Sequence, residues 1–330
     1  MEKIDVFNHI YPPGYFNFFE KRHSMMESMA SQLNDLIDFD SRIRRMDSLG
    51  INREILSLAL PGIDDLMVDS RSMQSVTRTA NDSMRDTVDS YPDRFLAIGT
   101  VSLTDPDFAV EETIRCVKDL KLLGIQVVSN VKGEPLDTEG TEPFYSVLEK
   151  LDVPLWIHPT FMRNQYQWME DFRTDIMVGW DFDTTLALIR LAGSGIIDRH
   201  RKLKVIVHHL RSLIPVLAGR IAGFISGEGK SSSEVIENLK SLYVDTAEGM
   251  WMPWLGSAIQ FFGIDHIMFG TDFPWGDSRG ILENIEKAVG NESDLERIYE
   301  GNAKRVIRFK QRSQKSFHTH LFKSSNLHFT

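Results

Sequence analysis

The sequence predicts a single α/β domain built as an eight-stranded parallel barrel, the (β/α)8 or TIM barrel. Eight short apolar runs recur along the chain, and segments with helical spacing separate them. Several runs are apolar throughout and do not alternate with polar residues, which is typical of strands covered on both faces. The length of 330 residues suits one barrel of ~250 residues with additions.

Each predicted strand is a short run bounded by helical or polar segments. In order, the runs are Lys3–Val6, Arg53–Ala59, Phe95–Val101, Ile125–Ser129, Val153–Ile157, Leu203–Val207, Ser241–Val244 and His266–Gly270. Apolar residues at helical spacing fill the connections, for example in Glu111–Leu122, Thr184–Ala192 and Trp254–Phe262. Residues 12–46 and 160–182 are rich in aromatic residues and methionine, and we expect them to form small insertions around a site.

The C-terminal part of the chain differs in charge from the rest. Gly301–Thr330 contains seven lysines and arginines and no acidic residue. We expect Asn302–Phe309 to close the barrel as its last helix, so that residues 1–309 form the barrel and residues 310–330 a basic tail. His318 and His320 copy a metal-binding spacing, but no strand pattern or acidic neighbour surrounds them, so we do not expect them to bind a metal.

Composition excludes several classes of protein. The formal net charge of −10 argues against nucleic acid as a partner. No apolar run approaches the ~20 residues of a membrane helix, and the N-terminus lacks the layout of a signal peptide. The single cysteine, Cys116, is typical of a protein in a reducing compartment. We therefore expect a soluble cytoplasmic protein.

Metal-binding residue types follow four of the predicted strands. His9 ends the first, His158 the fifth, the pair His208-His209 the sixth, and Asp272 the eighth. The carboxyl ends of barrel strands meet at one face, where barrel enzymes carry their chemistry. Imidazole and carboxylate groups hold divalent ions while leaving a coordination position open. This pattern predicts a metal site at the mouth of the barrel.

The order and spacing of these motifs resemble the amidohydrolase-2 branch of the amidohydrolase superfamily. That branch includes aminocarboxymuconate-semialdehyde decarboxylase and the nonoxidative aromatic-acid decarboxylases. The resemblance covers residues 1 to about 309, and the segments that carry it are Ile4–Pro12, Arg42–Asp47, Gly124–Val127, Pro154–Pro159, Lys202–His209, Phe269–Pro274 and Gly301–Arg305.

The resemblance implies a role for each residue at the strand ends. His9, His158 and Asp272 match metal ligands, His209 matches a catalytic histidine, and Asp272 also handles a proton. The first-strand pattern His-x-His is altered here, with Phe7 at the first ligand position. Because neighbours on a strand point to opposite faces, we expect only His209 to face the metal, with the preceding His208 packing under a loop or binding a carbonyl.

The implied cofactor is one divalent ion. Two imidazoles and one carboxylate suit zinc, with manganese and iron as alternatives. The implied activity is nonoxidative decarboxylation, a carbon–carbon lyase reaction on a small conjugated or aromatic carboxylic acid. The same residues serve an alternative, metal-dependent hydrolysis of an ester, lactone or amide. Phe7 motivates a third reading, a catalytically reduced paralogue that supports a partner subunit.

Three further residues are candidates for binding the substrate. Arg44, one of three arginines before the second strand, lies near where relatives place an arginine that contacts a substrate carboxylate. Trp180 and Trp275 lie in or beside loops at strand ends, where indole rings make a wall suited to a planar acid. We expect a small-molecule carboxylic acid as the substrate, and a homo-oligomer, most simply a dimer, with no nucleic-acid or membrane partner.

Overall fold

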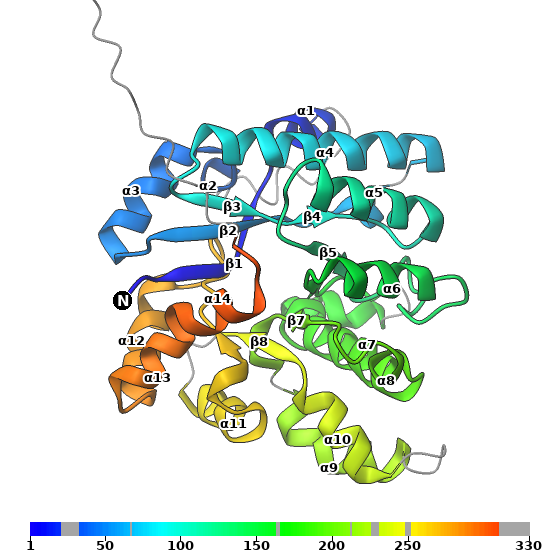
Figure 1. Cartoon of the computed structure of the whole chain (residues 1–330), viewed down its shortest axis with the longest axis vertical. Coiled ribbons are helices and arrows are strands. Elements are labelled where there is room, and N and C mark those ends of the chain that lie inside the picture. Colours follow the sequence, from blue (N-terminus) through cyan, green and yellow to red (C-terminus); the bar gives the residue numbers. More distant parts are fainter. Residues whose placement is uncertain are drawn as a thin grey trace, which may run out of the picture.

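The computed structural model describes residues 1–20, 33–66, 68–162, 166–211, 213–225, 231–247 and 252–309. The predicted barrel is confirmed (Figure 1). Within these residues the strands are β1 Ile4–Ile10, β2 Arg53–Leu58, β3 Phe95–Ala97, β4 Gly99–Thr100, β5 Ile125–Val128, β6 Leu155–His158, β7 Val205–Val207, β8 Tyr243–Asp245 and β9 Ile267–Met268. β3 and β4 are two parts of one barrel strand, interrupted only at Ile98.

The strands close into a ring in the order of the sequence. All of the paired strands are parallel: β1 to β3 form one ladder and β4 to β9 another. The amide of Ile98 donates to the carbonyl of Leu56 at 3.1 Å, which joins the two ladders. The amides of Val6 and His9 donate to carbonyls of residues 269 and 273, both at 2.8 Å, and connect β1 to the chain after β9.

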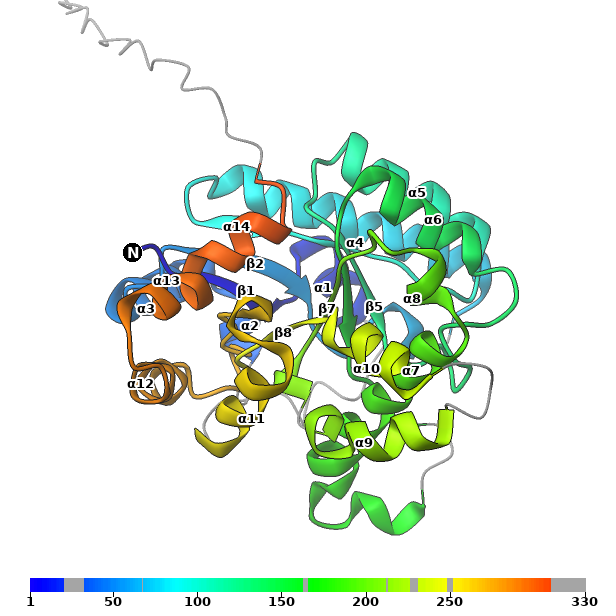
Figure 2. The same ribbon diagram turned by 60° about the horizontal axis from the view of Figure 1, so that its bottom comes forward.

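Helices form the outer layer of the barrel (Figures 1 and 2). They are α3 Phe39–Leu49, α4 Ser70–Ser90, α5 Pro106–Lys118, α6 Glu142–Leu151, α7 Asp181–Gly193, α8 Ile196–Arg199, α9 Leu213–Ile225, α10 Ser232–Lys240, α11 Met252–Phe262, α12 Ser278–Ala288, α13 Glu292–Glu296 and α14 Asn302–Val306. Several begin at an aspartate that accepts a hydrogen bond from the first turn; Asp105, with Pro106 next to it, does this for α5.

The two predicted insertions contain short helical segments. Residues 12–46 include α1 Pro13–Glu20 and α2 Leu33–Ile37 in addition to α3. Residues 160–182 include the 3-10 segment Gln167–Arg173 and the π-helical turn Asp175–Trp180. The predicted basic tail, residues 310–330, lies outside the described residues.

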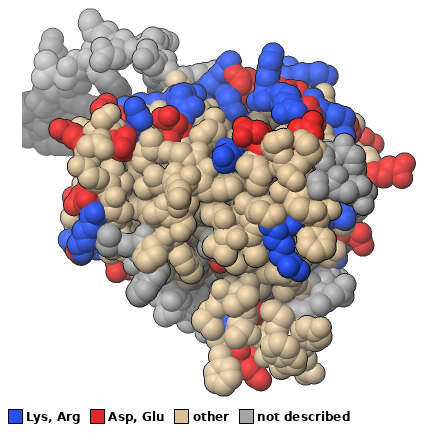
Figure 3. Space-filling model, turned by 90° about the horizontal axis from the view of Figure 1, so that it is seen from below, with Lys and Arg blue, Asp and Glu red and all other residues tan. Residues whose placement is uncertain are grey.

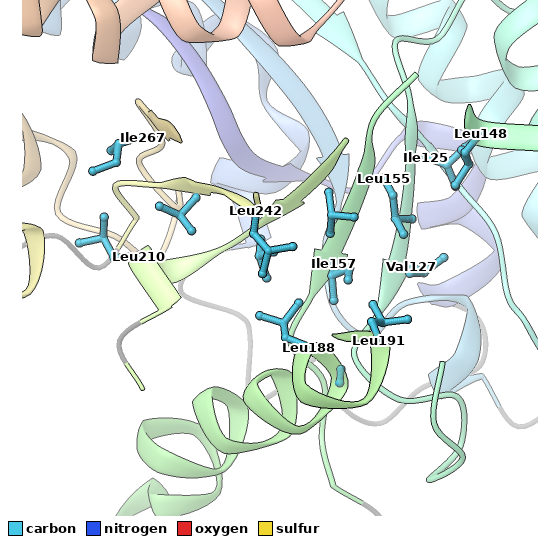
Figure 4. Close-up of a cluster of buried hydrophobic side chains, with 14 of the residues drawn as sticks. Ile125, Val127, Leu148, Leu155, Ile157, Leu188, Leu191, Leu210, Leu242 and Ile267 are labelled. Carbon is cyan, nitrogen blue, oxygen red and sulfur yellow. The ribbon is translucent and has the colours of Figure 1, made fainter. Parts of the chain in front are cut away.

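Side-chain alternation along the strands divides the core into an outer and an inner part. On β6, Leu155 and Ile157 face outward and pack with Leu188 and Leu191 of α7 (Figure 4). Trp156 lies between them in the chain and belongs to a separate cluster inside the barrel. The same helix-covered packing explains why the strand runs are apolar throughout.

The inner cluster fills one end of the barrel with apolar side chains. It contains Ile4, Val6, Ile55, Ile98, Trp156, Ile206 and Met268 from the strands, and Ala303, Val306 and Ile307 at the C-terminal helix. α14 lies beside the start of β1 in both ribbon views (Figures 1 and 2), so it covers the amino ends of the strands. The polar strand-end residues are left for the opposite end.

Two properties of the surface bear on partners. Among the helices of the described ranges, none combines the length and apolar character needed to cross a membrane. Large apolar side chains are nevertheless exposed; they include Tyr166, Trp168, Phe172, Met177, Val178, Phe182, Leu186, Val216, Phe224 and Trp254. These belong mostly to residues 166–186, α9 and α11, and the face seen from below carries broad areas without charged residues (Figure 3).

Candidate active site

The structure brings together the four predicted residues at the strand ends. The Nε2 atom of His9 lies 3.1 Å from Oδ1 of Asp272, and the ring centroids of His9 and His158 are 4.9 Å apart. The Nε2 atom of His209 lies 4.0 Å from Oδ2 of Asp272. All three histidines are buried, and the Asp272 side chain is 14% exposed. The cluster therefore sits at the bottom of the barrel mouth with one carboxylate near its opening.

Hydrogen bonds fix which nitrogen of two histidines faces the cluster. The Nδ1 atom of His158 lies 2.6 Å from the carbonyl oxygen of Pro159, so Nδ1 carries the proton. The Ser57 hydroxyl donates to the carbonyl of Asn8 at 2.8 Å, so its oxygen accepts from Nδ1 of His9 at 3.1 Å. Both rings thus turn the lone pair of Nε2 toward the centre, the arrangement that metal-bound histidines use.

Burial controls the charge state of these groups. Burial lowers the pKa of His9 well below its usual value, and the nearby His209 and Arg42 add to this effect. Burial, with His9 nearby, likewise lowers the pKa of His158. Burial raises the pKa of Asp272, although His209 and His158 partly oppose the rise. Burial therefore favours the uncharged form of His9, His158 and Asp272.

Backbone conformation also distinguishes this region. His209, Leu210 and Asp272 have φ angles of 66°, 50° and 55°, in the left-handed region that residues other than glycine seldom adopt. The Asp272 amide donates to the carbonyl of Phe7 at 2.9 Å, and its carbonyl accepts from the amide of Trp275 at 2.8 Å. Strained residues held in this way concentrate at functional sites, where the rest of the fold compensates for their cost.

Phe7 packs at the centre of the histidine cluster. Its ring centroid lies 4.5 Å from that of His9, 5.6 Å from His158, 3.5 Å from His208 and 5.5 Å from His209. The residue is fully buried. An aromatic ring thus occupies the position where the family resemblance implies a metal ligand.

A bulge in β1 directs Phe7 into the site. The pairing of β1 with β2 shifts register between Asp5 and Asn8. Ile4 and Val6 belong to the inner apolar cluster, and the bulge lets the next residue, Phe7, also point inward, where it faces the histidines. The Asp5 carboxylate accepts a hydrogen bond from the Phe7 amide at 3.1 Å, which stabilises the turn. Bulges often re-aim side chains next to active sites in this way.

The expectation that only His209 faces the site is wrong, because His208 also points into the barrel. Counting two residues on from the inward-facing Ile206 already places His208 inside the barrel, where its ring stacks on Phe7. β7 ends at Val207, and the left-handed turn at His209 then brings the second ring to the same place. The Nδ1 atom of His208 lies 2.6 Å from Oδ2 of Asp245.

Asp245 is a residue of this cluster that the sequence analysis missed. Its other oxygen, Oδ1, accepts from the amides of His209 at 3.2 Å and Ala247 at 3.1 Å, so one carboxylate holds both adjacent histidines. The signal was present in the sequence, since Asp245 directly follows an apolar run and Asp272 lies two residues beyond one. Gly270 makes room for this group, because a Cβ there would lie 2.9 Å from Cβ of Asp245.

Of the three arginines before β2, Arg42 and Arg45 bind residues of the barrel strands, whereas Arg44 points to the surface. Arg42 is buried and donates to Oδ1 of Asn8 at 3.0 Å, to Oε2 of Glu54 at 2.9 Å and to the carbonyl of His9. Arg45 also binds Glu54, at 2.7 Å. Arg44 is exposed on α3, so its position gives the predicted substrate contact no support. The inward-facing arginines instead stabilise the strand that carries His9.

Both predicted tryptophans lie near strand ends. The Trp275 ring centroid is 5.2 Å from that of His9, and the residue is 42% exposed, so it forms an accessible edge of the cluster. The Trp180 ring lies 5.4 Å from the ring of Phe161, which follows β6. Phe161 is part of a pocket of about 190 Å³, lined by Asp64, Asp65, Asn130, Lys132, Thr160, Phe161 and Met162.

The donor atoms of the cluster are of the types that bind a divalent ion, but in this structure two of the side chains bond to each other. Within the described ranges, no three His, Cys, Asp or Glu side chains are arranged to cage an ion. Nε2 of His9 and Oδ1 of Asp272 instead bond directly to each other. Because His9 carries its proton on Nδ1, that bond requires a proton on Asp272. A divalent cation would replace this proton, so the donor set fits a metal.

Comparisons with known proteins agree with this geometry. The family described as Amidohydrolase matches residues 34–309. The gamma-resorcylate decarboxylase of Rhizobium sp. (strain MTP-10005) is 31% identical over 284 residues, covering 82% of this chain and 86% of the relative. The crystal structure of 2,6-dihydroxybenzoate decarboxylase complexed with 2,6-dihydroxybenzoate has a TM-score of 0.82 and 27% identity, covering 93% of this chain and 98% of that one.

A further solved structure contains a metal. The dihydroxybenzoic acid decarboxylase of Polaromonas sp. JS666, with bound manganese and the inhibitor 2-nitroresorcinol, has a TM-score of 0.77 and 26% identity. The match covers 92% of this chain and 96% of that one. Both structures match almost the whole of the described barrel.

Proposed function

This chain belongs to the amidohydrolase family, and we propose that it is a metal-dependent nonoxidative decarboxylase that acts on a hydroxylated aromatic acid. The convergence of His9, His158, His209 and Asp272 at one end of the barrel carries this proposal. The names of its relatives, among them gamma-resorcylate decarboxylase and 2,6-dihydroxybenzoate decarboxylase, support the substrate class.

Three residues would hold the metal ion. His9 and His158 present Nε2 lone pairs, and Asp272 adds a carboxylate oxygen. Two imidazoles and one carboxylate leave coordination positions open for substrate. When bound, the ion supplies positive charge that orients the substrate carboxylate and polarises its oxygens. Zinc was expected from the donor set alone. The manganese in the Polaromonas structure makes manganese the ion to test first.

The protein's own residues handle the proton. The bond between the ring carbon and the carboxylate breaks, CO2 leaves, and the electron pair stays on the ring carbon. That carbon takes a proton that Asp272, the carboxyl group at the opening of the cluster, has first accepted from His209. His209, 4.0 Å away, returns a proton to Asp272 from solvent. Asp245 positions His209 through its backbone amide.

Aromatic side chains provide the surroundings that this reaction needs. Phe7 forms an apolar floor beneath the imidazoles and keeps water from that side of the cluster. Trp275 is placed to stack against a planar substrate next to His9. Trp180 contributes indirectly, by packing against Phe161 in the neighbouring pocket.

Metal analysis followed by an assay of CO2 release tests the proposal. Protein purified without added metal is analysed for zinc, manganese and iron, then incubated with 2,6-dihydroxybenzoate and other hydroxybenzoates. We expect close to one equivalent of ion, release of CO2, and loss of both in a His158→Ala variant. Arg44→Ala, at an exposed position, is the matched control and should change neither. Protein that binds no ion and releases no CO2 would support the reduced paralogue instead.

Two further predictions concern the oligomeric state of the protein and its location in the cell. The homodimer stays a prediction, and the exposed apolar side chains of residues 166–186 and α9 are where we would seek its interface. Light scattering of the purified chain would measure its mass. A cytoplasmic location also stays a prediction, supported by Cys116 being a buried free thiol.

A further inference from the structure

A second polar centre lies beside the histidine cluster at the same end of the barrel. The pocket of about 190 Å³ is built by the loop after β2, the loop after β5 and the chain after β6. β6 connects the two centres, because His158 faces the cluster and Thr160, two residues later, lines the pocket. We call it the Lys132 pocket.

The pocket has the size and the wall of a site for a planar ring. A cavity of roughly 150 Å³ is enough to accept benzene. Phe161 and Met162 form the apolar part of the lining. Trp180 packs edge-on against Phe161, and the Met162 methyl would lie 3.4 Å from a Cβ built on Gly179, so the π-helical turn supports this wall from behind.

The polar groups of the lining are satisfied internally, with one exception. Asp64 accepts from the Ser102 hydroxyl, and Asp65 accepts from the amide of Gly62 at 2.7 Å. Asn130 donates to Asp183 at 2.8 Å and accepts from the amide of Gly133 at 2.8 Å. The Lys132 ammonium, in contrast, makes no hydrogen bond or ion pair with any residue in the described part of the chain.

The backbone also points to a role for Lys132. Its φ of 55° is left-handed, an uncommon conformation for lysine. The turn that imposes it is fixed by the bond between Gly133 and Asn130. Burial raises the pKa of Asp64 to about 7, while the Ser102 hydroxyl and the charge of Lys132 oppose the rise and the neighbouring Asp65 adds to it. The pocket thus offers a half-buried cation beside the carboxyl groups of Asp64 and Asp65.

We propose that the Lys132 pocket binds the part of the substrate that lies away from the reacting carboxylate. Lys132 selects an aromatic acid that carries a second carboxylate. This inference rests on the proposed function, since it assumes that the first carboxylate lies at the histidine cluster. An ammonium on a flexible stem forms strong, charge-assisted hydrogen bonds to a carboxylate without demanding one fixed geometry.

Binding measurements on metal-loaded, full-length protein test this assignment directly. The probes are benzene-1,3-dicarboxylate and benzoate, titrated by calorimetry. We expect the unmodified protein to bind the dicarboxylate more tightly than benzoate by on the order of tenfold or more, as one charge-assisted hydrogen bond provides. Lys132→Met should remove that preference and leave the affinity for benzoate unchanged. Lys132→Arg should keep most of it.

Lys121 supplies the matched control. It is also a lysine with a left-handed backbone, φ 59°, but it is exposed and its ammonium binds the carbonyl of Lys118. Lys121→Met should therefore bind both probes as the unmodified protein does. Equal affinity of the unmodified protein for the two probes, or a preference that survives Lys132→Met, would overturn the proposal.

The assay of CO2 release separates this inference from the function on which it rests. If the unmodified protein releases CO2 from a hydroxybenzoate but shows no Lys132-dependent preference, the decarboxylase stands and the pocket assignment fails. If the preference depends on Lys132 but no aromatic acid loses CO2, the pocket assignment stands and the decarboxylase fails.

Discussion

Two layers of inward-facing side chains, two residues apart on the same strands, differ completely in chemistry. The layer toward the amino ends is apolar and includes Ile55, Ile98, Trp156, Ile206 and Met268. Two residues further toward the carboxyl ends of the same strands, the inward-facing residues are Ser57, Thr100, His158, His208 and Gly270. Both layers are buried, so burial alone does not separate stability from function.

The contrast teaches how the barrel tolerates so many buried polar groups. The apolar layer packs with further apolar side chains and with the closing helix, so burial of its surface stabilises the fold directly. In the polar layer two imidazoles depend on partners that other strands provide, Ser57 for His9 and Asp245 for His208. Changes in the first layer should therefore alter stability, and changes in the second should alter binding and catalysis.

The largest effect is expected from emptying the apolar layer. Trp156→Ala removes the largest fully buried side chain and should lower the free energy of unfolding by about 3–5 kcal/mol. Urea denaturation followed by circular dichroism measures it. The metal content of the folded variant should stay near that of the unmodified protein. A stable variant that has lost its metal would show that the two layers are not separable.

The sequence could predict this layering because strand alternation is local. Runs such as Leu155-Trp156-Ile157-His158 read correctly as strands ending at the barrel mouth, and four strand-end residues were found from that pattern alone. The glycine before β5, Gly124, makes room for a side chain of the apolar layer. A Cβ on Gly124 would lie 2.5 Å from Cζ3 of Trp156, so the glycine lets the indole ring fill the layer.

Replacing the carboxylate of the polar layer should give the next largest effect. Asp272→Asn keeps the shape of the side chain but removes the charge and the proton that it transfers. We expect at least ~10²-fold lower turnover, the scale of losing a positioned acid–base group. The melting temperature should be nearly unchanged. Measurements of CO2 release and of thermal melting together distinguish a catalytic from a structural role. Normal turnover with a lowered melting temperature would show that Asp272 is a structural residue.

What the sequence could not predict depends on one-residue changes of direction and on partners far away in the chain. The bulge at Phe7 and the left-handed turn at His209 each break the alternation of faces along a strand, and neither has a periodic signal. Asp245 acquires its role only from the two histidines 37 and 36 residues before it. Lys132 lies in a loop, and only the assembled pocket shows that its ammonium lacks a bonded partner among the described residues.

Loss of an orienting hydrogen bond should have an intermediate effect. Ser57→Ala removes the oxygen that accepts from Nδ1 of His9 and so fixes its tautomer. Removing such a partner typically lowers metal affinity by about 10- to 100-fold. Competition with a chelator measures the change. Ser48→Ala is the control, because the hydroxyl of Ser48 is exposed and binds the carbonyl of Arg45 on the same helix. An affinity equal to that of the control variant would mean that Ser57 only fills space.

The smallest effect, and the one that tests the boundary between the layers, is expected at Phe7. This ring is an apolar residue within the polar layer, surrounded by four imidazoles. Phe7→His adds a nitrogen donor where the family resemblance implies one, and we expect metal affinity to rise by about tenfold, since a tenfold change needs only about 1.4 kcal/mol.

The same substitution should not raise turnover, because an additional ligand closes a position that the substrate needs. Phe7→Leu is the matched control: it also removes the aromatic ring stacked on His208 but adds no donor. If both variants bind the ion equally, the change comes from lost packing, and the introduced imidazole does not reach the ion. A rise confined to Phe7→His would show that Phe7 excludes a ligand from an otherwise competent site. The apolar ring would then set how open the metal is to substrate.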